Sequence, residues 1–250
     1  MEIDFKEQIV LVTGSTRGIG KQIADDFEQL GANLILIGTN KEEIDKLNKE
    51  AGGKRKSFKR YYAVDFADRE SVRFFIDKIN SYEKIDVCVN NAGINRINYI
   101  DKTLKKDWDD IITVNLEAPF MITRQVSKTM KKNKYGRIVN ISSIFGVISK
   151  AKRSIYSVSK FGIRGLTVSS ALDLAPYNIL VNTVSPGFVL TELTKNTLGE
   201  KEMKKLSRQV PLGRFAEPAE ISKIILFLAS KHNTYITGQN IVVDGGFINV

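Results

Sequence analysis

The 250-residue chain contains one cysteine and one histidine. Cys88 cannot form a disulfide within the chain, and the apolar run 85–89 around it is typical of a buried strand, so we predict no redox role for it. His232 has no partner at the spacing of metal ligands. The sequence therefore predicts no metal site.

Long apolar runs are also missing, since none reaches the ~18 residues of a membrane-spanning helix. Residues 1–4 include two acids and lack the charged-then-apolar order of a signal peptide. No internal repeat or low-complexity linker divides the chain. We therefore predict a cytoplasmic protein with no membrane contact, built as a single domain over residues 1–250.

Positive charge is in excess, with a formal net charge of +10 and a pI near 9.5. Clusters of lysine and arginine occur at 54–56, 59–60, 131–137 and 150–153. None of these clusters accompanies a helix-turn-helix, zinc-finger or aromatic stacking pattern. We predict that most of them are solvated surface and that the protein has no nucleic-acid partner.

Short apolar runs alternate with helix-like patterns along the whole chain. Strands are predicted near 8–13, 33–38, 58–64, 85–89, 136–141, 179–184 and 240–243, and helices near 18–30, 41–50, 69–81, 107–132, 155–175 and 217–230. This alternation predicts an α/β fold with one Rossmann-type, doubly wound parallel sheet of about seven strands and helices on both faces. Ligands of such sheets bind at the carboxyl ends of the strands.

A glycine-rich segment follows the first predicted strand and opens the first predicted helix. Its glycines let the backbone turn tightly and approach a pyrophosphate, which would rest on the helix amino terminus. The spacing Gly-x-x-x-Gly-x-Gly differs from the Gly-x-Gly-x-x-Gly of long-chain dinucleotide folds. The segment predicts a nucleotide site formed by Gly14, Ser15, Thr16, Arg17, Gly18, Ile19 and Gly20.

Tyr156 and Lys160 are four residues apart within a predicted helix, and Ser143 precedes the tyrosine. This spacing places the ammonium on the same helix face as the phenol. A unit charge at about 4 Å contributes roughly 4 kcal/mol at an effective dielectric near 20, which would lower the phenol pKa by about three. The spacing predicts a tyrosine that titrates near neutrality and acts as a general acid or base.

With both segments considered, the chain resembles the short-chain dehydrogenase/reductase family over nearly its whole length. The resemblance rests on motifs that occur in the family's order along the chain. The motifs are Thr13-Gly14-x-x-x-Gly18-Ile19-Gly20, Asp65, Asn90-Asn91-Ala92-Gly93, Asn115, Ser143, Tyr156-x-x-x-Lys160 and Pro186-Gly187. It implies a catalytic tetrad of Asn115, Ser143, Tyr156 and Lys160.

The resemblance also implies a role for each site residue. Tyr156 would exchange a proton with the carbonyl oxygen, Ser143 would orient that oxygen, and Asn115 would hold a water beside Lys160. Lys160 would hydrogen-bond the nicotinamide ribose, Asp65 the adenine and Thr191 the carboxamide. Further cofactor contacts are expected from Asn91, Ala92, Gly93, Pro186 and Gly187.

The end of the second predicted strand indicates which dinucleotide is used. A carboxylate there would bind the ribose 2′-hydroxyl of NAD, whereas a basic group would favour a 2′-phosphate. The segment 36–41 contains no carboxylate. Arg17 could pair with the phosphate, assisted by Thr39, Asn40 and Lys41. We therefore expect NADP(H) as the cofactor.

The segments that match 3-oxoacyl-acyl-carrier-protein reductases are 91–96, 210–214, 235–238 and 243–246, and sugar and polyol dehydrogenases share much of the carboxy-terminal ones. This predicts a 3-oxoacyl thioester on an acidic acyl carrier protein as substrate. A sugar, polyol or sugar-acid carbonyl is the alternative, and a non-catalytic dinucleotide sensor is a remote third. The family's frequent tetramers imply a homotetramer. The predicted substrate contacts are Arg96, Ile144, Phe145, Arg153 and Phe188, beneath a lid near 185–210.

Three cations, Lys150, Lys152 and Arg153, lie close together between the predicted catalytic serine and tyrosine. They would attract an anionic substrate, either the phosphopantetheine and carrier of an acyl group or the carboxylate of a sugar acid. A solvated turn or a contact between subunits would explain them equally well.

Overall fold

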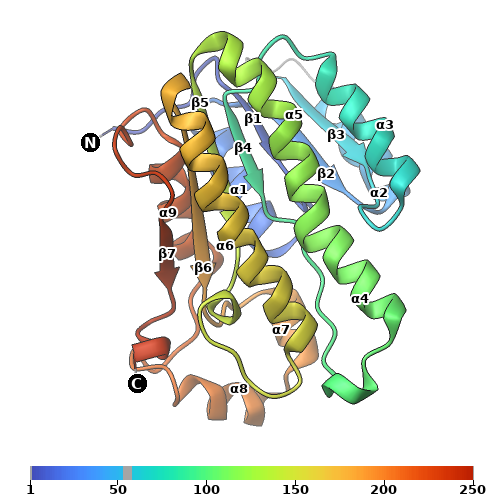
Figure 1. Ribbon diagram of the computed structural model, residues 1–250, viewed down its shortest axis with the longest axis vertical. Coiled ribbons are helices and arrows are strands. Elements are labelled where there is room, and N and C mark those ends of the chain that lie inside the picture. The colour runs from blue at the N-terminus through green and yellow to red at the C-terminus, as the bar shows by residue number, and fades with distance from the viewer. Residues whose placement is uncertain (1, 53–57, 250) are drawn as a thin grey trace.

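The computed structural model describes residues 2–52 and 58–249, so the basic cluster at 54–56 lies outside the described residues. One sheet of seven parallel strands has the order β3-β2-β1-β4-β5-β6-β7 (Figure 1). The strands are β1 (Ile9–Val12), β2 (Asn33–Gly38), β3 (Lys59–Ala63), β4 (Val87–Asn90), β5 (Gly136–Ile141), β6 (Ile179–Pro186) and β7 (Asn240–Val243). The order reverses between β1 and β4, which confirms the predicted doubly wound, Rossmann-type fold and places the ligand crevice beside these two strands.

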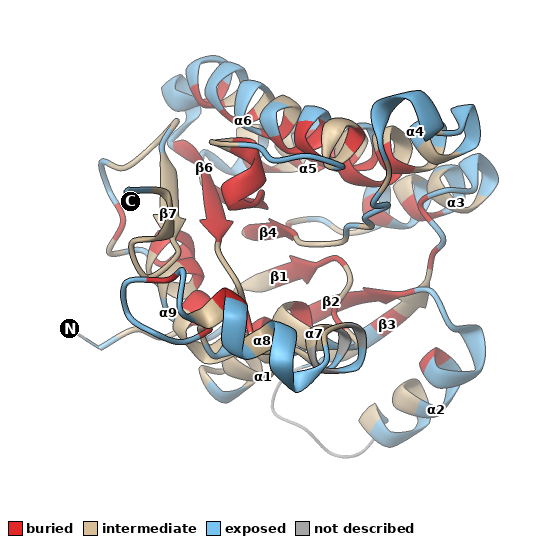
Figure 2. Cartoon of the chain, turned by 90° about the horizontal axis from the view of Figure 1, so that it is seen from below, coloured by how far each residue is buried: buried red, intermediate tan, exposed pale blue. Residues whose placement is uncertain are grey.

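Helices cover both faces of the sheet because successive strand residues point to opposite sides. Val10 and Val12 pack with α1 and α9, whereas Leu11 packs with α3, α5 and α6. Figure 2 shows these helix layers above and below the strands. The helices are α1 (Gly18–Gln29), α2 (Lys41–Ala51), α3 (Arg69–Asn80), α4 (Lys105–Ile112), α5 (Ala118–Asn133), α6 (Ser154–Leu174), α7 (Glu192–Thr197), α8 (Glu200–Ser207) and α9 (Pro218–Ala229).

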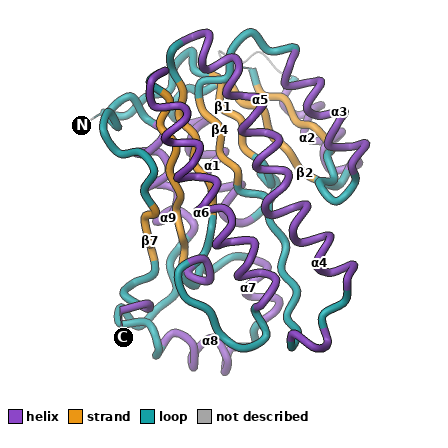
Figure 3. Tube along the Cα trace, in the orientation of Figure 1, coloured by secondary structure: helices purple, strands orange, loops and turns teal. Residues whose placement is uncertain are grey.

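The strands all point toward the lower end of Figure 1, where α7 and α8 also lie. Long loops gather at the same end, as the teal segments of Figure 3 show. The predicted lid near 185–210 contains these two short helices. That this segment closes over a substrate stays a prediction.

The helix predicted near 107–132 is interrupted in its middle. A π-helical turn, η2 (Thr113–Glu117), separates α4 from α5. A π-turn holds one residue more than an α-turn, and such turns often occur at functional sites. Asn115 lies buried within it, and the apolar spacing of the sequence did not signal this interruption.

Candidate active site

The glycine loop, residues 13–20, joins β1 to α1 and is built for close backbone contact. Gly14 and Gly18 have positive φ angles of 63° and 56°, which favour glycine. A Cβ on Gly20 would lie 2.1 Å from the Gly14 carbonyl oxygen. The first turn of α1 has no acidic residue, so its N–H groups can receive an anion. The loop thus has the form that a pyrophosphate requires.

Hydrogen bonds fix this loop to the ends of neighbouring strands. The Ser15 hydroxyl donates to the Ile37 carbonyl at 3.1 Å, and the Thr13 hydroxyl accepts from the N–H groups of Asn91 and Ala92, both at 2.9 Å. The Asn91 side chain donates to the carbonyl oxygens of Thr13 and Gly14, both at 3.0 Å. Asn91 therefore supports the loop from β4, a role that the sequence alone did not assign to it.

A buried polar network behind the loop was missed at the sequence level. Asn90 donates to Asn140 at 2.8 Å and to Thr123 at 3.2 Å, and Asn140 donates to Thr167 at 2.8 Å. Thr183 also donates to Thr167, at 2.7 Å. The network joins β4, β5 and β6 to helices α5 and α6. Asn140 within the apolar run 136–141 was the available signal, since a buried strand amide needs partners.

Asn115 uses its side chain to hold the backbone that follows β4. Its Oδ1 accepts from the Ile94 N–H at 2.8 Å, and its Nδ2 donates to the Ile94 carbonyl at 2.9 Å and to Ser159 at 3.1 Å. Ser159 in turn donates to the Tyr156 carbonyl at 2.7 Å. Asn115 thereby connects the cofactor side of the site to α6, while its predicted water-holding role stays a prediction.

Ser143, Tyr156 and Lys160 meet at the carboxyl end of β5. Tyr156 and Lys160 lie one turn apart on α6, as their spacing predicted. The Lys160 ammonium donates to the Ile141 carbonyl at 2.9 Å and lies 5.7 Å from the centre of the Tyr156 ring. Ser143 follows β5 and accepts from the Phe145 N–H at 3.2 Å. The four predicted catalytic residues thus occupy one edge of the sheet.

The expected low pKa of the Tyr156 phenol is wrong. Burial raises the pKa of Tyr156, although a hydrogen bond with Ser143 and the charge of Arg153 lower it in part. Lys160 points toward Ile141, and burial lowers its own pKa to about 8. The cost of burying the charged forms exceeds the attraction on which the prediction was based.

Two of the residues expected to distinguish NADP(H) from NAD(H) bind other groups of the protein. Asn40 caps α2 by accepting from the Glu43 N–H at 2.9 Å, and Lys41 pairs with Asp45 at 2.7 Å. These bonds argue against the assistance expected from Asn40 and Lys41. Arg17 and Thr39 are exposed at this edge.

Asp65, the residue expected to contact adenine, follows β3 and is exposed. One of its carboxylate oxygens accepts from the Ala67 N–H at 2.9 Å, and its own N–H donates to Ser71 at 2.9 Å. The side chain thus stabilises the turn before α3, and its other carboxylate oxygen has no hydrogen bond to a described residue.

The lid begins against the glycine loop. A Cβ on Gly18 would lie 3.4 Å from the Thr191 methyl, and Thr191 caps α7 by accepting from the Thr194 N–H at 3.2 Å. Pro186 ends β6, and a Cβ on Gly187 would lie 2.8 Å from the Asp244 backbone. The predicted cofactor contacts Pro186, Gly187 and Thr191 therefore lie on one segment, which runs from the end of β6 to the glycine loop.

The five predicted substrate contacts do not form one group in the structure. Phe145 lies beside Tyr156, with ring centres 6.4 Å apart, and Arg153 stacks on Phe145. Ile144 is buried. Phe188 packs against Phe215 and Phe247, with ring centres 5.2 and 5.1 Å away. Arg96 pairs with Asp107 at 3.7 Å.

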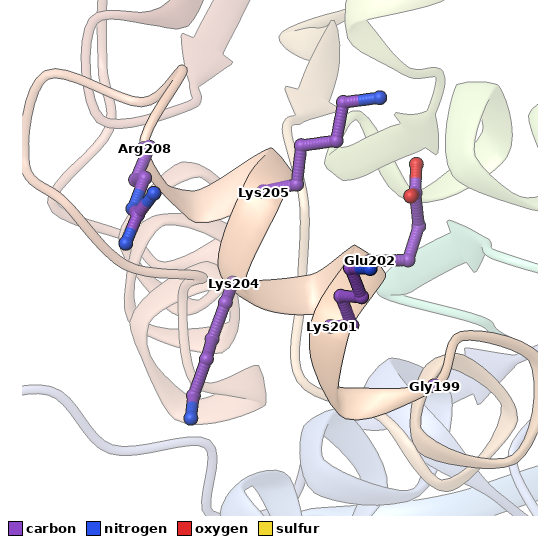
Figure 4. A pocket seen from close by; sticks show the side chains of 6 residues that line it. All are labelled: Gly199, Lys201, Glu202, Lys204, Lys205 and Arg208. Atoms are coloured by element: carbon purple, nitrogen blue, oxygen red, sulfur yellow. The ribbon is translucent and has the colours of Figure 1, made fainter.

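A surface hollow on the lid is lined by α8 and its flanks and contains none of the tetrad. Lys205 and Glu202 extend to one side of the helix, and Lys204 extends to the other (Figure 4). The cations therefore do not converge on one point, and the hollow is not part of the candidate site. Its lining residues are Gly199, Lys201, Glu202, Lys204, Lys205 and Arg208.

Comparison with protein families agrees with this geometry. A family model described as enoyl-(acyl carrier protein) reductase matches residues 14–248. The chain belongs to the short-chain dehydrogenase/reductase family. It is accordingly an NAD(P)-dependent oxidoreductase of the short-chain type.

Short-chain reductases of known name resemble the chain over its full length. It is 39% identical to the 3-oxoacyl-[acyl-carrier-protein] reductase of Aquifex aeolicus over 98% of this chain and 99% of that protein. The corresponding reductase of Thermotoga maritima is 40% identical, covering 96% of this chain and 98% of its own.

Solved structures of the same family have similar backbones. A protein assigned as a gluconate dehydrogenase from Agrobacterium tumefaciens superposes with a TM-score of 0.90 at 30% identity, covering 99% of this chain and 98% of its own. A protein assigned as an NAD(P)-dependent gluconate 5-dehydrogenase from Beutenbergia cavernae, with bound NADP, reaches 0.89 at 29% identity and covers 99% of both chains.

Two absences accompany the short-chain site. Within residues 2–52 and 58–249, no three histidine, cysteine or carboxylate side chains are grouped as metal ligands would be. No helix of that described part is long and apolar enough to cross a membrane.

Proposed function

We propose that this chain reduces a ketone to a secondary alcohol with NADPH and that Tyr156 donates the proton. The observation that carries the proposal is a single turn of α6 that presents Tyr156 and the buried Lys160 beside Ser143. Lys160 is buried, and a buried ammonium is a costly feature in a protein interior. The position of Tyr156 and Lys160 at the carboxyl edge of a doubly wound sheet supports a catalytic role.

The cofactor that we propose is a dinucleotide with a 2′-phosphate. Gly14 and Gly20 bring the loop backbone close to Ala92 and Asn91, and Arg17 with Thr39 would receive the 2′-phosphate. When bound, the nicotinamide supplies the hydride. The family shares NAD(P) dependence, and one of the similar structures contains NADP.

Proton transfer is the part that the chain's own residues perform. The raised pKa of Tyr156 keeps the phenol protonated at neutral pH, as a proton donor to the carbonyl oxygen requires. Ser143 would hydrogen-bond the same oxygen and polarise the carbonyl. Below about pH 8 Lys160 carries a charge, which would stabilise the phenolate left after the transfer. Asn115 fixes α6 through Ser159 and would hold the water that returns the proton.

The first candidate substrate is a 3-oxoacyl thioester on an acyl carrier protein. Its support is the 39% and 40% identity to reductases of that name over nearly the whole chain. In the family two arginines near the mouth of the site dock the carrier, and this chain has Lys134 and Tyr177 at the matching positions, a departure that counts against this substrate. The Lys131 ammonium lies 4.7 Å from the centre of the Tyr177 ring, which leaves a cation at this surface.

The second candidate is a sugar-acid ketone, such as an oxidised gluconate. Its support is the similarity to the two proteins assigned as gluconate dehydrogenases, at 30% and 29% identity. The substrate would then carry a carboxylate, which suits the cations of 150–153.

We also propose a homotetramer. The outer sides of α5 and α6 expose large apolar side chains, a feature typical of protein interfaces. They are Phe120, Phe161, Val168 and Leu172. Light scattering of the purified protein would measure the assembly, and a monomer at micromolar concentration would contradict it.

Initial rates of NADPH and NADH oxidation with matched ketones test the proposed function. The panel should contain 3-oxoacyl thioesters of coenzyme A and of carrier protein, keto sugars, keto-sugar acids and simple ketones. Turnover of any of these excludes a non-catalytic sensor, and the ranking of kcat/KM separates the candidates. Binding of NADPH without turnover of any ketone or of the corresponding alcohols would overturn the proposal.

A further inference from the structure

The segment between Ser143 and Tyr156 contains three cations, and their side chains have different surroundings. Lys150 is exposed. The exposed Lys152 places its ammonium 4.6 Å from the centre of the Tyr99 ring. Arg153 instead places its guanidinium carbon 5.2 Å from the centre of the Phe145 ring. Of the three, Arg153 alone contacts an aromatic side chain beside the proton donor.

A strained backbone position produces this difference. Lys152 has a φ of 68°, in the left-handed region that few residues other than glycine adopt. Its carbonyl accepts from the Asn98 N–H at 3.3 Å, which fixes the turn. The two neighbouring side chains consequently contact different aromatic rings. Strain of this kind often occurs at functional sites.

The charge of Arg153 lacks compensation within the chain. Its Nε is buried without a hydrogen-bond partner, and no ion pair joins the side chain to a carboxylate among residues 2–52 and 58–249. A guanidinium does not lose its proton in a protein, so it must be paired or hydrated. The hydroxyl of Ser154, the next residue, is likewise buried without a partner.

Phe145 connects this unpaired charge to the chemistry. The centre of its ring is 5.2 Å from the guanidinium carbon of Arg153 and 6.4 Å from the centre of the Tyr156 ring. The charge of Arg153 is near enough to lower the pKa of Tyr156. A small ligand that spans Phe145 would contact both the guanidinium and the phenol.

We propose that Arg153 binds the carboxylate of an oxo-acid substrate while Tyr156 protonates its ketone. Guanidinium and carboxylate form charge-assisted and often bidentate hydrogen bonds, which would pair this charge. This inference rests on the proposed ketone reduction and favours the sugar-acid candidate over the thioester. A thioester has no ionised group close to its ketone.

The test compares ketones that carry a carboxylate with neutral ketones of similar size. Acetoacetate is paired with methyl acetoacetate, and 5-ketogluconate with neutral fructose. Arg153→Gln removes the charge and keeps hydrogen-bonding capacity, whereas Arg153→Lys keeps the charge without the planar fork. Lys152→Gln is the matched control, because it removes an adjacent cation that contacts Tyr99 instead.

We expect Arg153→Gln to lower kcat/KM for the two acids by about 10- to 150-fold, the range for a charge-assisted hydrogen bond. The ester and fructose should change by less than about threefold. Arg153→Lys should recover part of the loss, and Lys152→Gln should leave all four substrates within about threefold of wild type.

Several outcomes would overturn the inference. They are a wild type that prefers the ester to the acid, an equal loss on charged and neutral substrates, and a change of oligomeric mass with equal loss, which would place Arg153 at a subunit contact. If Arg153→Gln does not fold, Arg153→Met tests the same pairs with an apolar side chain of similar length. A wild type that reduces no ketone would overturn the proposed function itself, whereas ketone reduction with turnover of the two acids unaffected by Arg153→Gln would overturn this inference alone.

Discussion

The glycine loop and the segment 143–156 are both connections from a strand to a helix at the same edge of the sheet, but they treat polar groups differently. In the glycine loop, the hydroxyls of Thr13 and Ser15 form hydrogen bonds with backbone groups of the chain itself. In the second segment, donors of Arg153 and Ser154 are buried without partners.

This difference indicates how each connection recognises its ligand. The glycine loop offers backbone N–H groups and the space that glycines leave, so an added atom would damage it. The second segment offers charged and hydroxyl side chains, so a removed atom would damage it. The glycine loop can be identified from a fixed glycine pattern. The segment 143–156 could bind a different ligand after a single side-chain substitution.

The largest effect is expected where the second segment performs chemistry. Tyr156→Phe removes the transferable proton and keeps the ring, so kcat should fall by about 10²- to 10⁴-fold, the usual contribution of a general acid. NADPH affinity, measured by fluorescence titration, should stay within about twofold. A variant with near-normal turnover would show that another group supplies the proton.

An added methyl group tests the glycine loop. Gly20→Ala places a Cβ 2.1 Å from the Gly14 oxygen and 2.4 Å from Asn91, so we expect a loss of about 3 kcal/mol in unfolding free energy and of NADPH binding. Gly165→Ala in α6 is the control, because no atom lies within 4 Å of its Cβ. Urea unfolding should show Gly165→Ala more stable by about 0.5–1 kcal/mol. Similar effects at both glycines would refute the packing argument.

Arg17 belongs to the glycine loop, but we expect it to bind its ligand through its side chain, as residues of the segment 143–156 do. Arg17→Ala should weaken NADPH by about 10- to 150-fold, because it removes a charge-assisted hydrogen bond worth roughly 1.5–3 kcal/mol. NADH should bind as before, since it lacks the 2′-phosphate. Titration calorimetry with both dinucleotides measures the difference, and a wild type that prefers NADH would contradict the assignment.

The smallest of these effects concerns the stability cost of a buried charge. The Lys160 pKa falls from 10.5 to about 8 on folding, so below pH 8 the folded state carries an ammonium at a cost of roughly 3 kcal/mol. The cost disappears as pH rises from 8 to 10.5, because the folded state loses its proton first. Lys160→Met removes this cost but also the bond to Ile141, about 1 kcal/mol.

The methionine variant should therefore be about 2 kcal/mol more stable at pH 7 and no more stable than wild type at pH 10.5. Chemical denaturation of the cofactor-free protein across this range provides the measurement. A stability difference that does not vary with pH would mean that folding leaves the pKa of Lys160 unchanged.

The sequence predicted the fold because strand hydrophobicity and helix spacing are local properties. The parallel sheet of about seven strands, both helix layers and the α6 turn with Tyr156 and Lys160 followed from such patterns. The π-turn at Asn115, the left-handed backbone of Lys152 and the network around Asn140 did not, since each depends on contacts between distant segments. The pKa of Tyr156 was mispredicted for the same reason, because burial is not a local property.

The π-turn also shows which part of the molecule uses the additional residue. A π-turn completes one rotation with one residue more than an α-turn, so deleting one residue from 113–117 would restore an ordinary α-helix with α4 and α5 facing nearly as before. Ile111 and Ile122, both buried, would still face the protein interior. The deletion would instead displace Asn115, whose amide binds Ile94 and Ser159. The additional residue therefore serves the site, and the core would pack without it.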